Sequence, residues 1–84
     1  MALYEILYWQ EIPSKVNTWD DFDEVKLELP QRFTAHIDDS AQKQGLTSTD
    51  DYLAQWKWSD EREREGSAAE VVEAVRRELE ARFP

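Results

Sequence analysis

Residues 25–58 read VKLELPQRFTAHIDDSAQKQGLTSTDDYLAQWKW, and this stretch decides the fold that the sequence predicts. It opens with apolar residues at Val25, Leu27 and Leu29, which alternate with charged residues. A period of two places one apolar face inward and leaves the other in water, as is typical of a half-buried strand. We therefore expect a strand over residues 25–29.

The period changes at Pro30, which fits the first helical position because its missing N–H would have no partner there. Phe33, Ile37 and Ala41 follow at steps of four and form one apolar stripe. Gly45 can adopt the left-handed conformation that ends a helix. The sequence therefore predicts a helix between Pro30 and Gly45.

A second, short helix is expected after Thr47, because Thr47 and Asp50 have the spacing of a capping box. It would carry Tyr52, Leu53 and Trp56 on one side.

Near Gln55 the pattern returns to alternation, which favours a strand over residues 56–65. In that strand Trp58, Arg62 and Arg64 would share one side with Trp56, and a continued helix is the alternative.

Residues 2–12, ALYEILYWQEI, are apolar on both alternating faces. Such a run is typical of a central strand covered on both faces, and a buried helix is the alternative. Pro13 would close this strand, and residues 13–23, PSKVNTWDDFD, are rich in turn-forming residues and predict a loop. The apolar residues of that loop would pack on the core, form one helical turn or stay exposed as a patch; they are Val16, Trp19 and Phe22.

The last element is a helix that begins at the capping box formed by Ser67 and Glu70. Its apolar face consists of Val71, Val72, Val75, Leu79 and Phe83. The order strand, strand, helix, helix, strand, helix predicts an α+β fold with a small three-stranded antiparallel sheet packed with helices. We expect one domain over residues 1–84, with the first strand in the middle of the sheet.

Composition narrows the classes of partner. The formal net charge is −9, from 19 Asp and Glu against 10 Lys and Arg, so the surface repels nucleic acid and anionic membranes, and neither is expected to bind. The sequence contains no cysteine, no signal peptide and no membrane-spanning apolar run, which favours a cytoplasmic protein. So short a chain buries a limited core, and a homodimer interface would add stability.

The inventory of reactive residues is small. His36 is the only histidine and lies off the apolar stripe of its helix, so we interpret it as a surface residue rather than a general base. The acidic residues 20–24 lack the continuation of a calcium loop. Gly45 and Gly66 are the only glycines, which excludes a phosphate-cradling loop. We predict no catalytic residues, no metal, no cofactor and no small-molecule substrate.

The abundance of tryptophan points instead to contact with another protein, since tryptophan is enriched at the energetic centres of interfaces. The alternative is that the four tryptophans simply form the core. The candidate interaction surface consists of Trp9, Trp19, Phe22, Trp56 and Trp58, and its partner is unknown.

Part of the chain resembles the ribbon-helix-helix DNA-binding fold: VKLELP, a helix ending in QG, and LTSTDDYLAQW, within residues 25–56. The resemblance implies that the strand pairs with its copy in a second chain and reads DNA through Glu24, Lys26 and Glu28. Two of these three are acids, whereas base recognition uses Arg, Lys, Asn or Gln. A dimeric DNA-binding regulator is therefore an alternative that the charge disfavours.

A resemblance over nearly the whole chain is carried by YEILYWQEIPSKV, VKLELPQRF, GLTSTDDYL, QWKW and GSAAEVVEAV. In these motifs the chain looks like the short bacterial proteins of the "virulence factor" domain family, which occur alone or as pieces of larger conserved virulence proteins. The resemblance implies a bacterial cytosolic accessory domain and brings no catalytic residues to this sequence.

Overall fold

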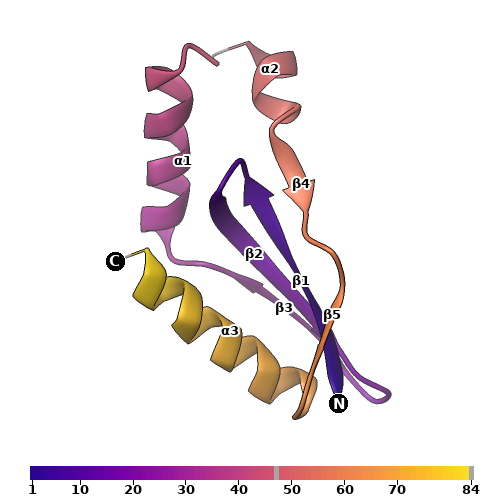
Figure 1. The fold of residues 1–84 in the computed structure, drawn as a ribbon. Helices are drawn as coiled ribbons and strands as arrows, with labels where there is room; N and C mark the ends of the chain where they lie inside the picture. The colour runs from indigo at the N-terminus through magenta and orange to yellow at the C-terminus, as the bar shows by residue number, and fades with distance from the viewer. Residues whose placement is uncertain (47, 84) are drawn as a thin grey trace.

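A computed structural model describes residues 1–46 and 48–83 of the protein, and in them the α+β class is confirmed. The sheet is antiparallel, with the order β3-β2-β1-β4, and β5 also pairs with β1 (Figure 1). The described residues form five strands rather than the three expected, together with three helices. The elements are β1 (Ala2–Trp9), β2 (Ile12–Trp19), β3 (Glu24–Glu28), α1 (Gln31–Lys43), α2 (Thr49–Leu53), β4 (Trp56–Trp58), β5 (Arg62–Arg64) and α3 (Ala68–Arg82).

The predicted loop over residues 13–23 is wrong, because most of it is strand β2. β1 ends at Trp9, and the chain reverses at Gln10 and Glu11 to form a hairpin. Gln10 adopts φ 55°, a left-handed conformation that turns usually assign to Gly or Asn. The sequence WQEI therefore forms a tight turn although it contains neither Gly nor Asn, the residues by which such a turn is usually predicted.

Pro13 lies inside β2 rather than ending a strand. Tyr8 pairs with Pro13 and Leu7 pairs with Lys15, so Ser14 is an extra residue and β2 contains a bulge. A bulge is one of the few places in a sheet where proline is tolerated, because proline cannot donate a ladder hydrogen bond.

A second irregularity splits the strand predicted over residues 56–65 into β4 and β5. Leu7 pairs with Trp58 and Tyr4 pairs with Arg62, so three residues of the returning chain lie opposite two residues of β1. Ser59 fills the gap: its N–H donates to the Ile6 carbonyl at 2.8 Å, and its Oγ accepts the Ile6 N–H at 2.9 Å. Since one extra residue reverses the side-chain alternation, Trp58 and Arg62 project to opposite faces and do not share a side as predicted.

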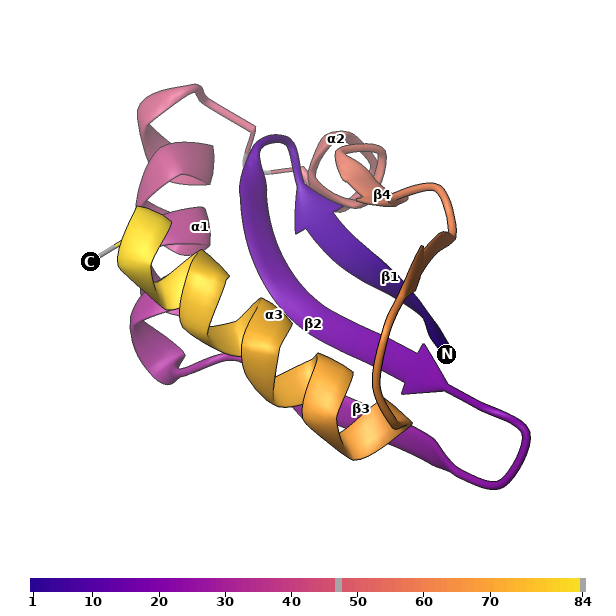
Figure 2. The same cartoon turned by 60° about the horizontal axis from the view of Figure 1, so that its bottom comes forward.

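α1 and α3 lie along the same side of β2, and the core forms between them and the sheet (Figure 2). The sheet contributes Ile6 and Val16 to this core, and the helices contribute the predicted stripes, including Phe33, Ile37 and Val75. The expectation that β1 lies inside the sheet is confirmed. The expectation that both of its faces are covered holds only at the Trp9 end. Trp9 lies on the same face as Leu7 and is buried against Tyr52 of α2, whereas Leu3 and Leu7 are half-buried on this face, which the long helices do not cover.

The helix ends follow the local signals closely. Gly45 has φ 72°, its N–H donates to the Gln42 carbonyl, and the Leu46 N–H donates to the Ala41 carbonyl at 2.9 Å. This pattern is a Schellman motif. The capping box of Ser67 with Glu70 is present at the start of α3.

α2 is capped by Ser48, whose side chain accepts the N–H of Asp51. Thr47, the predicted cap, lies outside the described residues. Leu53 of α2 is exposed, and Trp56 belongs to β4 rather than to the helix.

Asp20 joins the β2–β3 turn to the start of α3. Its Oδ1 accepts the N–H groups of Phe22 and Asp23 at 2.8 and 2.7 Å, and its Oδ2 accepts the N–H of Ala68 at 2.8 Å. The adjacent strand residue Thr18 is fully buried and donates its hydroxyl to the Ala68 carbonyl at 2.9 Å. Both contacts fix the first turn of α3 against the sheet.

Trp9 anchors the other end of the sheet. It is fully buried, its indole Nε1–H donates to the Tyr52 carbonyl at 3.0 Å, and its ring lies 5.8 Å from the Tyr52 ring. Trp56 meets the Tyr52 ring edge-on at 6.1 Å. This aromatic cluster holds α2 and β4 to the end of β1.

The ribbon-helix-helix resemblance does not extend to the fold. In that family the strand pairs with its copy in a second chain, whereas β3 pairs antiparallel with β2 of the same chain over Glu24–Glu28. The expected arrangement therefore does not form within this chain.

Trp9→Phe should lower the free energy of unfolding by about 1–3 kcal/mol, because it removes the bond to the Tyr52 carbonyl and leaves unfilled volume in the core. Urea unfolding followed by circular dichroism would measure this loss. Leu53→Ala, at an exposed position of α2, is the control and should cost no more than about 0.5 kcal/mol. An equal loss in both variants would show that Trp9 does not anchor the sheet.

Asp20→Asn should lower the unfolding midpoint at pH 7, since an amide cannot accept hydrogen bonds on both of its ends. The N–H of Ala68, followed by those of Phe22 and Asp23, lowers the pKa of the Asp20 carboxyl in the folded protein. The resulting stabilisation is complete above the pKa of the unfolded chain and is lost as the pH falls through the lower folded pKa.

The difference between wild type and Asp20→Asn should therefore shrink as the pH falls below about 4. Asp21→Asn, an exposed acid in the same turn, provides the control for loss of one charge. A difference that stays constant from pH 7 to pH 3 would contradict the role assigned to the Asp20 carboxylate.

Candidate functional site

The face of the sheet opposite α1 and α3 carries two of the five predicted interaction residues, Trp19 and Trp58. Side chains directly opposite one another on paired strands share a face. Leu3 pairs with Trp19, and Leu7 pairs with Trp58, so all four project to this side. We call the surface formed by Leu3, Leu7, Trp19 and Trp58 the open sheet face.

The open sheet face has two apolar spots separated by a polar pair. Glu5 and Asn17 face each other between the Leu3–Trp19 pair and the Leu7–Trp58 pair. A shallow hollow of about 360 Å³ lies beside Trp58 and is bordered by Lys15, Asn17 and Lys26.

Charged side chains surround these spots. Lys15 pairs with Glu28 at 3.8 Å, and Lys26 pairs with Glu24 at 3.4 Å. All four are exposed, so these ion pairs contribute little to stability. They give the rim of the face a mixed character, with two acids against two bases.

The five predicted interaction residues separate into different environments. Trp9 is a core residue with no exposed surface, so its place in the candidate interaction surface is wrong. Trp56 is half-buried against the core cluster. Trp19 is half-buried at the end of β2 rather than in a loop, and Trp58 is 46% exposed on β4. Phe22 is 90% exposed at the tip of the turn between β2 and β3.

Sequence reasoning missed Leu3 and Leu7 as surface residues. Because Leu3 and Leu7 alternate with Tyr4 and Ile6, the sequence predicted that the side chains on both faces of this strand would be buried. The pattern shows that both faces are apolar, but it cannot show that a second layer of helices is missing.

His36 is exposed on α1 and borders a hollow of about 290 Å³ with Arg32, Phe33, Arg82 and Phe83. Among the described residues, its lining contains no carboxylate that could orient the imidazole or share a proton with it. In the described parts of the chain, no three His, Cys, Asp or Glu side chains lie close enough together to hold a metal ion. No helix in residues 1–46 and 48–83 is long and apolar enough to cross a membrane.

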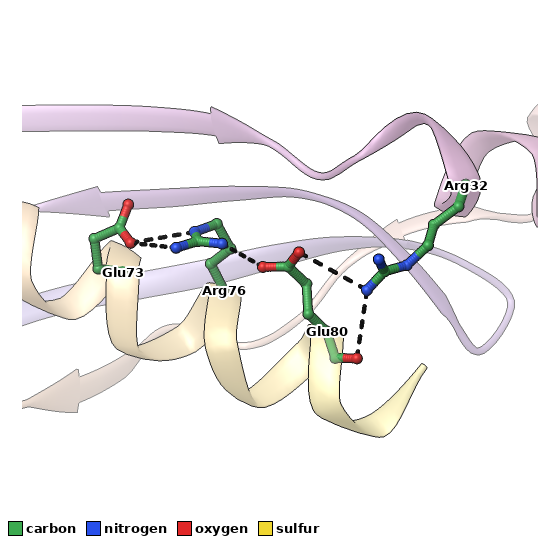
Figure 3. Close-up of polar contacts among 4 residues, drawn as sticks. All are labelled: Arg32, Glu73, Arg76 and Glu80. Atoms are coloured by element: carbon green, nitrogen blue, oxygen red, sulfur yellow. Dashed lines mark hydrogen bonds and ion pairs between the residues drawn. The ribbon is translucent and has the colours of Figure 1, made fainter. Parts of the chain in front are cut away.

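A ladder of charges connects α3 to α1 (Figure 3). The Arg76 guanidinium binds Glu73 at 2.6 Å and also binds Glu80, and the Glu80 side chain lies 3.8 Å from Arg32 of α1. The hydrogen bond from Arg76 lowers the pKa of Glu73, and Glu73 in turn raises the pKa of Arg76. The ladder engages Arg32 and Arg76 within the protein, so neither is a free cation for a ligand.

A family model described as "Virulence factor" matches residues 7–84. No curated protein and no solved structure matches the chain.

Trp58→Phe should remove a larger share of the quenchable tryptophan fluorescence than Trp9→Phe, because acrylamide reaches an exposed indole and not a buried one. Stern–Volmer plots of the wild type and the two variants would measure the accessible fraction. If Trp9→Phe removed the same share as Trp58→Phe, the burial of Trp9 would be contradicted.

Proposed function

The chain belongs to the family described as Virulence factor, and from this premise we propose that it is a non-catalytic accessory domain that binds another protein through the open sheet face. The single observation that carries the proposal is the position of Leu3, Leu7, Trp19 and Trp58 on a sheet face that neither α1 nor α3 covers. Apolar side chains grouped on an uncovered surface are typical of sites of protein contact.

The two apolar spots suit a partner that inserts side chains beside Trp58 and beside Trp19. Tryptophan gains most from such contacts because a large rigid ring buries much area at a low entropic cost. Phe22, at the tip of the adjoining turn, would extend the contact beyond the edge of the sheet.

The charge around the face favours a different polypeptide over a second copy of this chain. Glu5, Glu24, Glu28 and Glu63 lie on the side of the open sheet face, against Lys15 and Lys26. Two copies placed face to face would bring these acids together, in a chain whose net charge is −9. A partner with apolar residues inside a basic rim would meet the face without that repulsion.

The absence of catalysis is part of the proposal. The lone histidine lies among arginine and phenylalanine side chains, and Asp20, the acid with the largest number of hydrogen bonds, is occupied by backbone N–H groups. These arrangements are better suited to stabilising the fold than to transferring protons.

The decisive experiment introduces a photo-crosslinking amino acid in place of Lys15, which borders the hollow beside Trp58, and identifies the protein that is captured in the source cell. Binding of the purified partner is then measured by calorimetry. Trp58→Ala should weaken binding by about thirtyfold, which corresponds to the roughly 2 kcal/mol typical of an interface hot spot.

Leu53→Ala serves as the control, because Leu53 is also an exposed large apolar residue but belongs to α2 rather than to a strand of the sheet. Equal binding by the wild type and Trp58→Ala would refute the proposal. If light scattering gave the mass of a dimer and Trp58→Ala converted that dimer to a monomer, the partner would be a second copy of this chain rather than a different protein.

A further inference from the structure

A third surface hollow lies on the helix-covered side of the sheet, and its lining is rich in arginine although the protein as a whole is acidic. It has a volume of about 270 Å³ and lies between β1, β5 and the C-terminal half of α3. Three of the chain's 10 Lys and Arg residues border it, and the arginines come from two elements. They are Arg62 and Arg64 of β5 and Arg82 of α3.

The bulge at Ser59 explains why the β5 arginines border this hollow. Arg62 pairs with Tyr4 and Arg64 pairs with Ala2, so both project to the face on which α3 packs. Without the extra residue between β4 and β5, the alternation would place them with Trp58 on the open sheet face. The two surfaces are therefore separated by the same backbone irregularity.

The charges of the hollow are only partly balanced within the protein. Arg64 binds Glu78 at 2.5 Å, and Glu78 is the one carboxylate among the described residues of the lining. Neither Arg62 nor Arg82 forms an ion pair with another residue in ranges 1–46 and 48–83, in contrast to Arg76 in the ladder of Figure 3. The lining thus retains about two positive charges in a chain whose net charge is −9.

The remaining polar groups of the hollow favour an anion. Tyr4 and Tyr8 border it and can donate hydroxyl protons, and the Ser59 hydroxyl already donates to the Asp60 carbonyl. The floor includes the buried side chains of Ile6, Val75 and Leu79, which lower the local dielectric and strengthen charge-assisted hydrogen bonds.

We propose that this hollow binds a phosphate monoester carried by a small molecule, with Arg62 and Arg82 as its principal ligands. A phosphate monoester carries about 1.5 to 2 negative charges at pH 7, which matches the excess in the lining, and it offers several acceptor oxygens to the guanidinium forks. The hollow is near the lower end of the usual size of ligand pockets, so the rest of the molecule is small. The acidic surroundings, including Glu61 and Glu65, repel the extended phosphate backbone of a nucleic acid.

An alternative interpretation of Arg62 and Arg64 is that they only prevent aggregation, since charged residues on a short outer strand discourage association of sheet edges. That reading requires neither Arg82 nor a preference for doubly charged anions. The experiment therefore varies both the arginine and the charge of the ligand.

The test uses phenyl phosphate, inorganic phosphate and phenyl sulfate as probes of the wild-type protein, with binding followed by shifts of backbone amide NMR signals. Phenyl phosphate should bind at least about tenfold more tightly than the singly charged phenyl sulfate, and its shifts should map to β5 and the last turns of α3. Inorganic phosphate should shift the same signals, which would assign recognition to the phosphate group rather than to the phenyl ring.

Arg62→Gln and Arg82→Gln should each weaken phenyl phosphate binding about tenfold, because each removes a charge-assisted hydrogen-bonding fork. Arg77→Gln, on α3 but outside the hollow, carries the same change of charge and should alter the dissociation constant less than about twofold. Thermal unfolding of the variants would show that each is folded.

The proposal is overturned by any of three results. The first is the absence of amide shifts with phenyl phosphate up to roughly 10 mM. The second is equal affinity for phenyl phosphate and phenyl sulfate, and the third is equal weakening by Arg77→Gln and Arg62→Gln.

Discussion

The pairing of Ser59 with Ile6 places Trp58 and the β5 arginines on opposite sides of the sheet. Both the N–H and the Oγ of Ser59 bond to the Ile6 backbone, so one extra residue is accommodated without losing the ladder. Since strand side chains alternate with a period of two, this single insertion reverses the alternation after Trp58. The exposed tryptophan and the β5 arginines consequently belong to different surfaces.

The two surfaces have different physical characters because only one face of the sheet is covered. The helix-covered face contains the core, and its margin beside α3 combines buried aliphatic side chains with guanidinium groups. The open sheet face has three half-buried apolar residues, the exposed Trp58 and paired surface charges, and neither α1 nor α3 covers it. The first environment suits a small anion, and the second suits an extended protein contact.

The position of α3 depends on contacts near both of its ends. Asp20 and Thr18 form hydrogen bonds with the backbone of Ala68 at the N-terminus of α3, and Arg32 donates a hydrogen bond to the Glu80 carbonyl near its C-terminus. These contacts come from β2, from the turn after it and from α1. Because the same helix carries Arg82 and Glu78, whatever stabilises α3 also fixes the shape of the hollow beside β5.

Neighbouring residues alone specify the local structure. The strand over residues 25–29, the helix with Phe33, Ile37 and Ala41 inward, the left-handed Gly45 and the capping box of Ser67 all depend on neighbouring residues, and all are present. The family is also evident in the motifs of the chain.

The β1–β2 hairpin, the bulges at Ser14 and Ser59, and the burial of Trp9 could not be predicted from neighbouring residues. Each depends on the pairing of distant strands, which can place Gln10 at a positive φ or a proline inside a strand against the local preference. The same holds for the open sheet face, because whether Leu3 and Leu7 are covered is set by where the helices pack and not by the alternation of the residues themselves.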